Sequence, residues 1–450
     1  MKKVVSAAIV ILLILTLSQP VFARGDSLTP SRPVHSEIVY LFSMDEQRVV
    51  YQRNADRPAY PASLAKIMTC ILALENTPDL RTIVTFPTYI QNYLFDYQVR
   101  YRVSVSLAGM RAGEEMPMHD LLRGLMLQSG NEIAMIIAHH ISGSQAAFVE
   151  KMNRRARELG AMNTNFTNAT GLPDPAMVTT ARDMAIITRH AMGLPGFMDI
   201  VTTASHSAGP TNIHTRLEWS TTISMQVEAS RFFYPPLRGI KTGTTPQAGR
   251  NFISSATRDG FTYLLVLMNA PFINPETGTP FDEHYAFVDA RNIYDWAFDT
   301  FRIMPLIGRN MRIHEVPLRL NAGQDFLPLE TAERVTALVA RDADLETDLV
   351  RIYEVPEWVD APVQRGERIG YVRLLLDGHE VGRVDLLAAE TVSASRALLL
   401  LDQLGAAANS FWFRFAVIFT VLLIVLYVVL MIARNRNRRR RSAYKPRRRI

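Results

Sequence analysis

Three short segments carry side chains whose types and order could support nucleophilic catalysis. Ser63 and Lys66 stand three residues apart, which is nearly one helical turn, so a helix would place the hydroxyl and the amine on one face. A lysine can activate a serine as a base when burial or a second cation lowers its pKa. Taken alone, however, such a pair is more often a helix cap and a solvated lysine.

Two further polar segments follow along the chain. Ser129 and Asn131 flank a glycine between two helical runs, where a tight turn would point both side chains into a cleft. Lys241-Thr242-Gly243-Thr244 is typical of a strand in which Gly243 leaves room for a ligand beside the backbone. Each segment alone also fits an ordinary loop or edge strand. Their occurrence together and in this order favours one shared active site.

The elements around these segments indicate a sheet with a helical insertion. Strand patterns occur at both ends of the first 300 residues, and helical patterns lie between them. The expected strands are 38–42, 49–51, 237–242, 252–257 and 261–268, and the expected helices are 64–74, 119–127, 132–140, 145–159 and 285–301. Since the strands from both ends must share one sheet, the sequence predicts an α+β arrangement with a helical subdomain.

Charge is distributed very unevenly over the 450 residues. Residues 434–450 hold ten lysines and arginines and no acid, whereas the whole chain has a net charge of +6. Removing these ten, together with Lys2, Lys3 and Arg414, leaves −7 for residues 24–410. Because the body of the protein is acidic, nucleic acid is not expected as a partner.

The two ends predict export and membrane attachment. Residues 1–23 combine Lys2 and Lys3, an apolar run and small residues before a cut after Ala23, as in a secretory signal peptide. An uncleaved anchor is the less favoured alternative, because the apolar run is shorter than a span of about 20 residues. Residues 411–433 predict one transmembrane helix, with Trp412 at one border and the basic tail 434–450 in the cytoplasm. The body would then lie on the extracytoplasmic side of the cell membrane.

Between these ends the chain changes character near residue 305. Residues 305–395 contain short strand patterns and an Asp-Gly turn, which predict a second, β-rich domain. Residues 396–410 include a small-residue run and would form a stalk to the membrane. The part that contains the three motif segments would therefore occupy residues 24–304.

No metal site or other cofactor is predicted. His139 and His140 point in different directions at the end of a helix, and no carboxylate cluster accompanies them. Glu132 is best explained as a helix-opening carboxylate near the helix dipole. Cys70 is the single cysteine, so no intramolecular disulfide can form, and the residue is typical of a small buried hydrophobe.

Taken together, the three segments resemble the signature of the penicillin-binding and β-lactamase-like serine enzymes: serine-x-x-lysine, serine-x-asparagine and lysine-threonine-glycine. The similarity extends to the exported D-alanyl-D-alanine carboxypeptidases, which are low-molecular-weight penicillin-binding proteins. It covers residues 61–69, 127–134, 146–153, 239–244 and, in their C-terminal β domain, 361–370. The resemblance implies a β-lactamase/penicillin-binding-protein-like transpeptidase fold, then a small all-β domain and one C-terminal transmembrane helix.

The resemblance also implies catalytic roles. Ser63 would attack the carbonyl between the two terminal D-alanines of a peptidoglycan stem peptide, with Lys66 as the base, and form an acyl-enzyme. Ser129 would relay a proton to the leaving amine, and water would then release the shortened peptide. β-Lactams would act as covalent inhibitors of the same serine.

Substrate binding would fall to the other motif residues. Asn131 would bind the substrate backbone, and Lys241 and Thr242 would meet its terminal carboxylate. Gly243 would leave room for the ligand, and the N–H of Thr244 would complete an oxyanion hole with that of Ser63.

Two departures from the family pattern bear on efficiency. Many relatives have histidine where this chain has Thr244, and many place an arginine for the substrate carboxylate just after the strand 261–268. Here only Arg250 or Arg291 could substitute for that arginine. The alternatives are D,D-endopeptidase activity on cross-links, β-lactam hydrolysis, which is ranked low, and a catalytically weak peptidoglycan-binding scaffold. The oligomeric state is left open.

Overall fold

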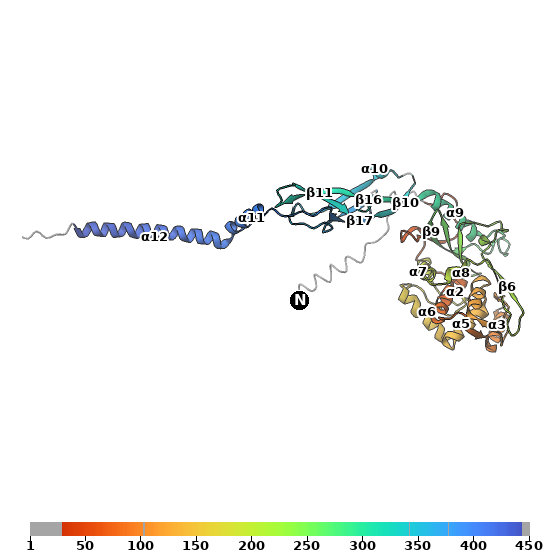
Figure 1. Cartoon of the computed structure of the whole chain (residues 1–450). Helices are drawn as coiled ribbons and strands as arrows, with labels where there is room; N and C mark the ends of the chain where they lie inside the picture. Colours follow the sequence, from red (N-terminus) through yellow and green to blue (C-terminus); the bar gives the residue numbers. More distant parts are fainter. Residues whose placement is uncertain (1–28, 102–103, 342, 377, 443–450) are drawn as a thin grey trace, which may run out of the picture. The chain divides into compact units, whose positions relative to one another are not determined.

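The computed structural model describes residues 29–101, 104–341, 343–376 and 378–442 (Figure 1). The predicted signal peptide, residues 1–23, and the end of the basic tail lie outside the described residues. The chain divides into two compact units. Unit 1 comprises Met1–Arg302 with Leu338–Asp342, and unit 2 comprises Ile303–Ala337 with Ala343–Ile450.

A five-stranded antiparallel sheet, in the order β2-β1-β9-β8-β7, forms the centre of unit 1. Its strands are β1 (Ile38–Ser43), β2 (Arg48–Arg53), β7 (Leu237–Thr245), β8 (Gly249–Arg258) and β9 (Phe261–Ala270). Strand β1 pairs directly with β9, although more than 200 residues separate them in the sequence. The prediction that strands from both ends of this region share one sheet is therefore confirmed.

Strand β9 is apolar on both faces because helices cover the sheet on both sides. Leu264, Val266 and Met268 belong to the hydrophobic core that the sheet shares with the helical part. The alternate residues face the opposite way, and Tyr263 packs against Phe298 of α9 (Tyr285–Thr300) with ring centroids 5.0 Å apart. A continuous apolar strand is what burial on both faces requires.

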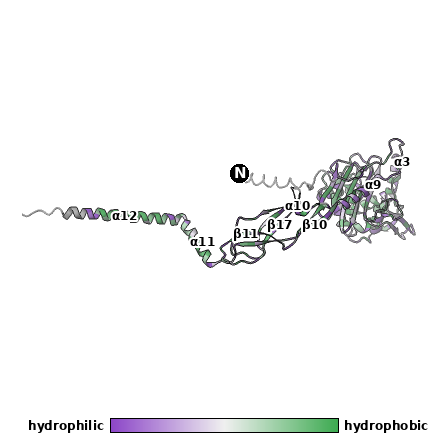
Figure 2. Cartoon of the chain, turned by 90° about the horizontal axis from the view of Figure 1, so that it is seen from above, coloured by the Kyte–Doolittle hydropathy of each residue, from purple (hydrophilic) through white to green (hydrophobic). Residues whose placement is uncertain are grey.

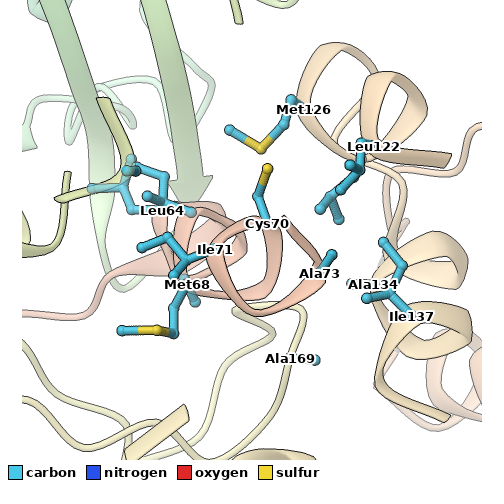
Figure 3. Packing of buried hydrophobic residues seen from close by; sticks show 14 of the residues in the cluster. Leu64, Met68, Cys70, Ile71, Ala73, Leu122, Met126, Ala134, Ile137 and Ala169 are labelled. Carbon is cyan, nitrogen blue, oxygen red and sulfur yellow. The ribbon is translucent and has the colours of Figure 1, made fainter. Parts of the chain in front are cut away.

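The helical part of unit 1 is built around α2 (Lys66–Asn76), whose residues are buried from Lys66 to Ala73. Around it lie α3 (Thr88–Tyr101), α4 (Met118–Leu127), α5 (Asn131–Ser142), α6 (Gln145–Leu159), α7 (Ala181–Met192) and α8 (Phe197–Val201). Figure 3 shows Cys70 of α2 pointing toward Met126 of α4. Burial raises the pKa of the Cys70 thiol to about 12, so the residue behaves as the buried hydrophobe that the sequence predicts.

Two short two-stranded sheets, the second of them a hairpin, complete unit 1. Strands β3 (Ile83–Thr85) and β4 (Glu115–Pro117) pair with each other, as do β5 (Ser205–Ala208) and β6 (Leu217–Ser220). The hairpin of β5 and β6 is tied to the helical part by His206 Nε2, which lies 2.6 Å from a carboxylate oxygen of Asp120 on α4. A short 3-10 turn, η2 (Ser224–Gln226), leads from this hairpin toward β7.

Unit 2 contains a six-stranded sheet in the order β14-β16-β17-β12-β11-β15. Its pairs are antiparallel except for the short parallel pair of β11 and β15. The strands are β11 (Arg312–Arg319), β12 (Phe326–Thr331), β14 (Leu349–Glu354), β15 (Val359–Asp360), β16 (Arg368–Leu376) and β17 (His379–Ala388), with the short helix α10 (Leu345–Asp348) before β14. A separate two-stranded sheet consists of β10 (Phe301–Ile307) and β13 (Val335–Ala340).

The C-terminal part is helical. Helix α11 (Arg396–Asn409) occupies the predicted stalk, and α12 (Phe411–Ser442) follows it. The most apolar 18-residue window within Phe411–Arg436 has a mean hydropathy of 3.2, and Figure 2 shows the long apolar stretch in green. Among the described residues it is the one helix long and apolar enough to cross a membrane.

Candidate active site

Ser63 lies on a tight turn that leads directly into α2. Residues Ala62–Ala65 form a 3-10 turn, η1, and the α-helix begins at Lys66, two residues later than the expected start at Leu64. Neither end of this turn has a side-chain cap, so the Ser63 hydroxyl does not serve as a helix cap. It remains available to Lys66, whose Nζ lies 3.1 Å from Ser63 Oγ.

The Lys66 amine is fully buried and has three partners. Besides Ser63 Oγ, Nζ contacts Asn131 Oδ1 at 2.9 Å and Thr170 O at 2.5 Å. The amide and carbonyl oxygens can only accept hydrogen bonds. A neutral amine has two N–H bonds and one lone pair, so donation to these two oxygens leaves the lone pair facing the serine hydroxyl. In the neutral form the third contact can thus run from the serine hydroxyl to the amine, whereas in the charged form Nζ donates to all three oxygens.

The electrostatic surroundings favour this neutral form. Burial is the largest cause that lowers the pKa of Lys66 well below its usual value, and the nearby Lys241 lowers it further. Glu132 acts in the opposite direction. Burial also lowers the pKa of Lys241 to about 7. Charge on Lys241 therefore disfavours charge on Lys66.

Ser129 and Asn131 lie on the turn that opens α5. Asn131 is oriented by Ser106, whose carbonyl accepts hydrogen bonds from Asn131 N at 2.9 Å and Asn131 Nδ2 at 3.0 Å. This orientation aims Asn131 Oδ1 at Lys66. Ser129 has a φ of 58°, and its buried Oγ has no hydrogen-bond partner among the described residues. A buried hydroxyl without a partner costs stability, and such groups occur where a ligand or reaction supplies the partner.

Strand β7 brings the lysine-threonine-glycine segment against the nucleophile turn. A Cβ on Gly243 would lie 3.0 Å from Ser63 N and 3.1 Å from Pro61 O, so a larger residue would push the strand away from the turn. Thr242 Oγ1 lies 2.7 Å from Thr222 Oγ1. Lys241 Nζ has a single hydrogen bond of 3.2 Å, to the Thr242 carbonyl. Lys241 thus lies close to the site, but among the described residues this one bond is the only hydrogen bond that holds its amine.

A cavity of about 730 Å³ opens beside Ser63. Of the residues predicted for the site, Ser63, Asn131 and Thr244 line its wall. The other predicted residues, Lys66, Ser129, Lys241, Thr242 and Gly243, are not part of this wall. The cavity therefore extends from the nucleophile past Thr244, and Lys241 lies outside it.

The sequence analysis missed a residue that fixes the turn carrying Ser63. Asn251 on β8 is buried, and its Nδ2 donates to the carbonyls of Tyr60 at 2.8 Å and Pro61 at 3.1 Å. Its Oδ1 accepts from Asn269 N at 2.9 Å. No motif around Asn251 indicates this contact, because its partners lie about 190 residues earlier in the chain.

A second missed element is the loop that supplies Thr170 O to Lys66. Asn168 Oδ1 accepts hydrogen bonds from the backbone N–H groups of Thr170, Gly171 and Leu172, which fixes the loop. Gly171 has a φ of 80°, and a Cβ there would lie 1.9 Å from Ala62 O. An Asn-x-x-Gly sequence favours a turn, but it does not reveal the turn's partner.

Glu132 has a structural contact that the sequence does not indicate. It lies in the first turn of α5, as expected, and its Oε1 accepts from Ala108 N at 2.5 Å and Gly109 N at 2.9 Å. Burial raises the pKa of Glu132 to about 7. Through Ala108 and Gly109, the Glu132 carboxyl group thus holds the segment that contains Ser106. The carbonyl of Ser106 in turn accepts the hydrogen bonds that orient Asn131.

The two arginines suggested as replacements for a carboxylate-binding arginine are held elsewhere. Arg250 pairs with Thr244 across β7 and β8, but its guanidinium donates to the carbonyls of Phe281 and Glu283. Arg291 donates to the carbonyls of Phe232 and Phe233. Neither guanidinium is free to meet a ligand without giving up these bonds.

Comparison with known proteins identifies the family. A model described as D-alanyl-D-alanine carboxypeptidase matches residues 27–272, and one described as the C-terminal domain of penicillin-binding protein 5 matches residues 305–394. The chain is 26% identical over 408 residues to the D-alanyl-D-alanine carboxypeptidase DacF of Bacillus subtilis, covering 90% of this chain and 98% of DacF. It is 28% identical to DacA of Haemophilus influenzae, covering 80% of this chain and 85% of DacA.

Solved structures show the same fold. Penicillin-binding protein 5 of Haemophilus influenzae superposes with a TM-score of 0.60 at 24% identity, covering 81% of this chain and 99% of that protein. Penicillin-binding protein 6B of Escherichia coli gives 0.60 at 21% identity, covering 82% and 99%. The chain therefore belongs to the D-alanyl-D-alanine carboxypeptidase family of serine peptidases, penicillin-binding proteins of peptidoglycan metabolism.

Proposed function

We propose that this carboxypeptidase removes the terminal D-alanine of peptidoglycan stem peptides through an acyl-enzyme on Ser63. The observation that carries the proposal is the environment of Lys66 Nζ. Its two N–H bonds have acceptors in Asn131 Oδ1 and Thr170 O, and its third contact is Ser63 Oγ at 3.1 Å. A scaffold that had lost its chemistry would have no need to bury an amine in this way.

Acylation follows from this geometry. Ser63 Oγ bonds to the carbonyl carbon between the two D-alanines while its proton moves to Lys66 Nζ. The N–H groups of Ser63 and Thr244 bind the oxyanion, and the loss of one such donor costs about 3 to 4 kcal/mol in known serine enzymes. The close approach that Gly243 permits brings β7 to this position.

Breakdown of the tetrahedral intermediate needs a proton on the leaving amine. Ser129 Oγ, which has no other partner in the described part of the chain, receives the proton from Lys66 and passes its own to the amine as the amide bond breaks. Lys241 and Thr242 bind the carboxylate of the departing D-alanine. The carboxylate favours the protonated form of Lys241, whose pKa of about 7 makes that form accessible at neutral pH. Water then hydrolyses the ester and restores Ser63.

The rest of the chain would hold this site at the outer surface of the cell membrane. The proposed organisation is a signal peptide (1–23), the peptidase domain (24–304), a β-rich domain (305–395), a stalk (396–410), a membrane span (411–433) and a cytoplasmic basic tail (434–450). Support comes from the apolar segment Phe411–Arg436 and from the arginines that follow Ala433, which favour a cytoplasmic C-terminus.

Intact-mass spectrometry with benzylpenicillin tests the nucleophile. The full chain in detergent should gain the mass of one penicillin, and Ser63→Ala should gain none. Ser106→Ala is a matched control, because Ser106 lines the same cavity and its hydroxyl has no assigned role. Absence of an adduct on folded wild-type protein would contradict the acyl-enzyme mechanism.

Product analysis then tests the reaction. Incubation with a stem pentapeptide should release free D-alanine, whereas a cross-linked dimer should remain intact. Cleavage of the dimer without release of D-alanine would instead establish a D,D-endopeptidase.

A further inference from the structure

Helix α3 carries tyrosines at a regular spacing that the mechanism above does not use. Tyr89, Tyr93, Tyr97 and Tyr101 recur every four residues, which places them along one side of the helix. Ring centroids lie 6.3 Å apart for Tyr93 and Tyr97, and 4.6 Å apart for Tyr97 and Tyr101. We call the continuous set of Tyr93, Tyr97 and Tyr101 the tyrosine row.

The helix that carries this row is firmly held to unit 1. Ile90 and Leu94 on its inner side are buried in the hydrophobic core. The hydroxyl of Tyr89 lies 3.1 Å from His139 Nδ1 on α5, and Figure 1 shows α3 and α5 together in unit 1. Unlike the buried Ile90 and Leu94, Tyr93 is 47% exposed and Tyr101 is 57% exposed. Large aromatic rings left in solvent on an anchored helix indicate a binding surface.

The tyrosine row is continuous with the catalytic cavity. Tyr97 and Tyr101 line the same cavity wall as Ser63, and Tyr93 lies one turn of α3 farther along. Ser63 and Thr244, which the proposed mechanism places at the carbonyl of the acyl part, line this cavity. If that mechanism holds, the cavity receives the acyl side of the substrate. The row then extends the path of the substrate chain away from the scissile bond.

The length of the acyl chain limits how far from Ser63 its amino end can lie. Four extended peptide residues, the acyl part of a stem pentapeptide, span about 13 Å. The amino end of the stem peptide is attached to an N-acetylated sugar of the glycan strand. A chain that starts at Ser63 and follows the cavity wall past Tyr97 and Tyr101 would carry this sugar toward the row.

The chemistry of the row suits such a sugar. The C–H face of a pyranose ring packs on an aromatic ring, and phenol hydroxyls can bond its hydroxyl and acetamido groups. Both phenols are protonated at neutral pH, as tyrosines ordinarily are, and can donate hydrogen bonds. We propose that the tyrosine row is a glycan subsite, in which Tyr93 packs against the N-acetylated hexosamine at the amino end of the stem peptide.

Competition with a fluorescent penicillin tests the proposal independently of which bond the enzyme hydrolyses. The full chain in detergent is labelled in the presence of either a free stem pentapeptide or the same pentapeptide attached to its disaccharide. The readout is the ratio of the two concentrations that halve the labelling rate. For wild type the disaccharide form should be effective at about five-fold lower concentration, the scale expected for one aromatic contact.

Three variants isolate the row. Tyr93→Ala should bring the ratio to about one, and Tyr93→Phe should keep most of the preference because the ring remains. Phe95→Ala is the matched control, since Phe95 is 65% exposed on another face of the same helix and should leave the ratio unchanged.

The outcomes separate the two proposals. A wild-type ratio of one, or a preference that survives Tyr93→Ala, would overturn the glycan subsite while penicillin labelling continues. Equal loss in Phe95→Ala would also overturn it, because the effect would then belong to the helix as a whole. Failure of wild type to be labelled at all would instead contradict the acyl-enzyme on Ser63.

Discussion

The two sides of the active site differ in how completely the protein itself holds them. On the nucleophile side, Lys66 has three partners, and Asn251 and Gly171 fix the turn that carries Ser63. On the carboxylate side, Lys241 has one hydrogen bond, although it is equally buried. Ser63 and Lys66 are thus fixed by contacts within the protein, whereas in the proposed mechanism the substrate carboxylate would supply the partner that Lys241 lacks among the described residues.

The missing arginine bears on the side of the site that contains Lys241. Arg250 is bound to the carbonyls of Phe281 and Glu283, and Arg291 to those of Phe232 and Phe233, so neither guanidinium can meet a ligand without giving up these bonds. A site with one weakly engaged cation should bind the terminal carboxylate less tightly than one with two. Chemistry and recognition are therefore expected to respond differently to mutation, and four changes test this expectation.

The largest loss of activity should come from replacing Lys66, the proposed base. Lys66→Met should slow penicillin acylation about 10³-fold or more, because Ser63 loses the group that takes its proton. Folding should survive, since methionine fills the buried site without a polar group. Lys151→Met, on the surface of α6, is the control and should acylate normally. Comparable acylation by Lys66→Met would assign the base to another residue.

The pH dependence of acylation sharpens the same point. Since the pKa of Lys66 is held well below its usual value, the amine is neutral far below the pH at which an exposed lysine loses its proton. Acylation should therefore proceed at neutral pH and decline in acid. A rate that rose only at strongly alkaline pH would contradict a prearranged neutral amine.

The next largest effect should come from Gly171, which lies against the turn that carries Ser63. Gly171→Ala places a methyl group against Ala62 O and should lower the free energy of unfolding by about 3 kcal/mol, with loss of acylation. Gly143→Ala is a matched control, because Gly143 also has a positive φ but has open space around it. It should cost about 1 kcal/mol in urea unfolding and leave acylation intact. Similar losses in both variants would mean that backbone strain, not contact with the turn, is responsible.

Unlike Gly171→Ala, Lys241→Met should stabilise the folded protein, although it should lower the activity. The folded pKa of about 7 lies below the unfolded value of 10.5, so the lysine's cost to stability is fully present below pH 7 and fades as pH rises toward 10.5. The variant should therefore melt several degrees higher than wild type at pH 6 and gain less at pH 9, while its activity falls. A lower melting temperature at pH 6 would show that Lys241 has a stabilising partner after all.

The smallest effect should come from Glu132. Its folded pKa of about 7 lies above the unfolded value of 4.5, so the folded state binds the proton more tightly and wild-type stability should fall as pH rises between these values. Glu132→Gln should lack this slope and keep the hydrogen bonds to Ala108 and Gly109. Glu115→Gln, at an exposed position, should retain the wild-type slope. Parallel unfolding curves for wild type and Glu132→Gln across this range would disprove the assignment.

Local patterns in the sequence were enough to predict the fold class and to propose the motif residues. The serine-x-x-lysine pair lies within one turn, and the strand with Gly243 has a recognisable composition, so short-range spacing carries both. The contacts that fix Ser63 are of another kind. Asn251 and Gly171 act on a turn more than 100 residues earlier, and each looks ordinary among its own neighbours. Such contacts follow from tertiary packing, which no local spacing encodes.

The start of α2 shows a similar limit. Helical spacing predicts the face shared by Ser63 and Lys66, but the turn at Ser63 is 3-10 and Ala62 has a φ of 49°. Backbone from two other elements presses on this turn, at Gly171 and Gly243, and only the folded structure reveals that crowding.

The buried thiol of Cys70 has a practical consequence for spectroscopy. It is the sole cysteine of the chain, and its high pKa and burial keep it from reacting with maleimide or nitroxide reagents under native conditions. A cysteine introduced at an exposed position would therefore be the only site labelled, with no background mutation. Pairing such a label at Phe326 or Trp358 of unit 2 with a lipid-attached quencher would measure how far each position stands from the bilayer.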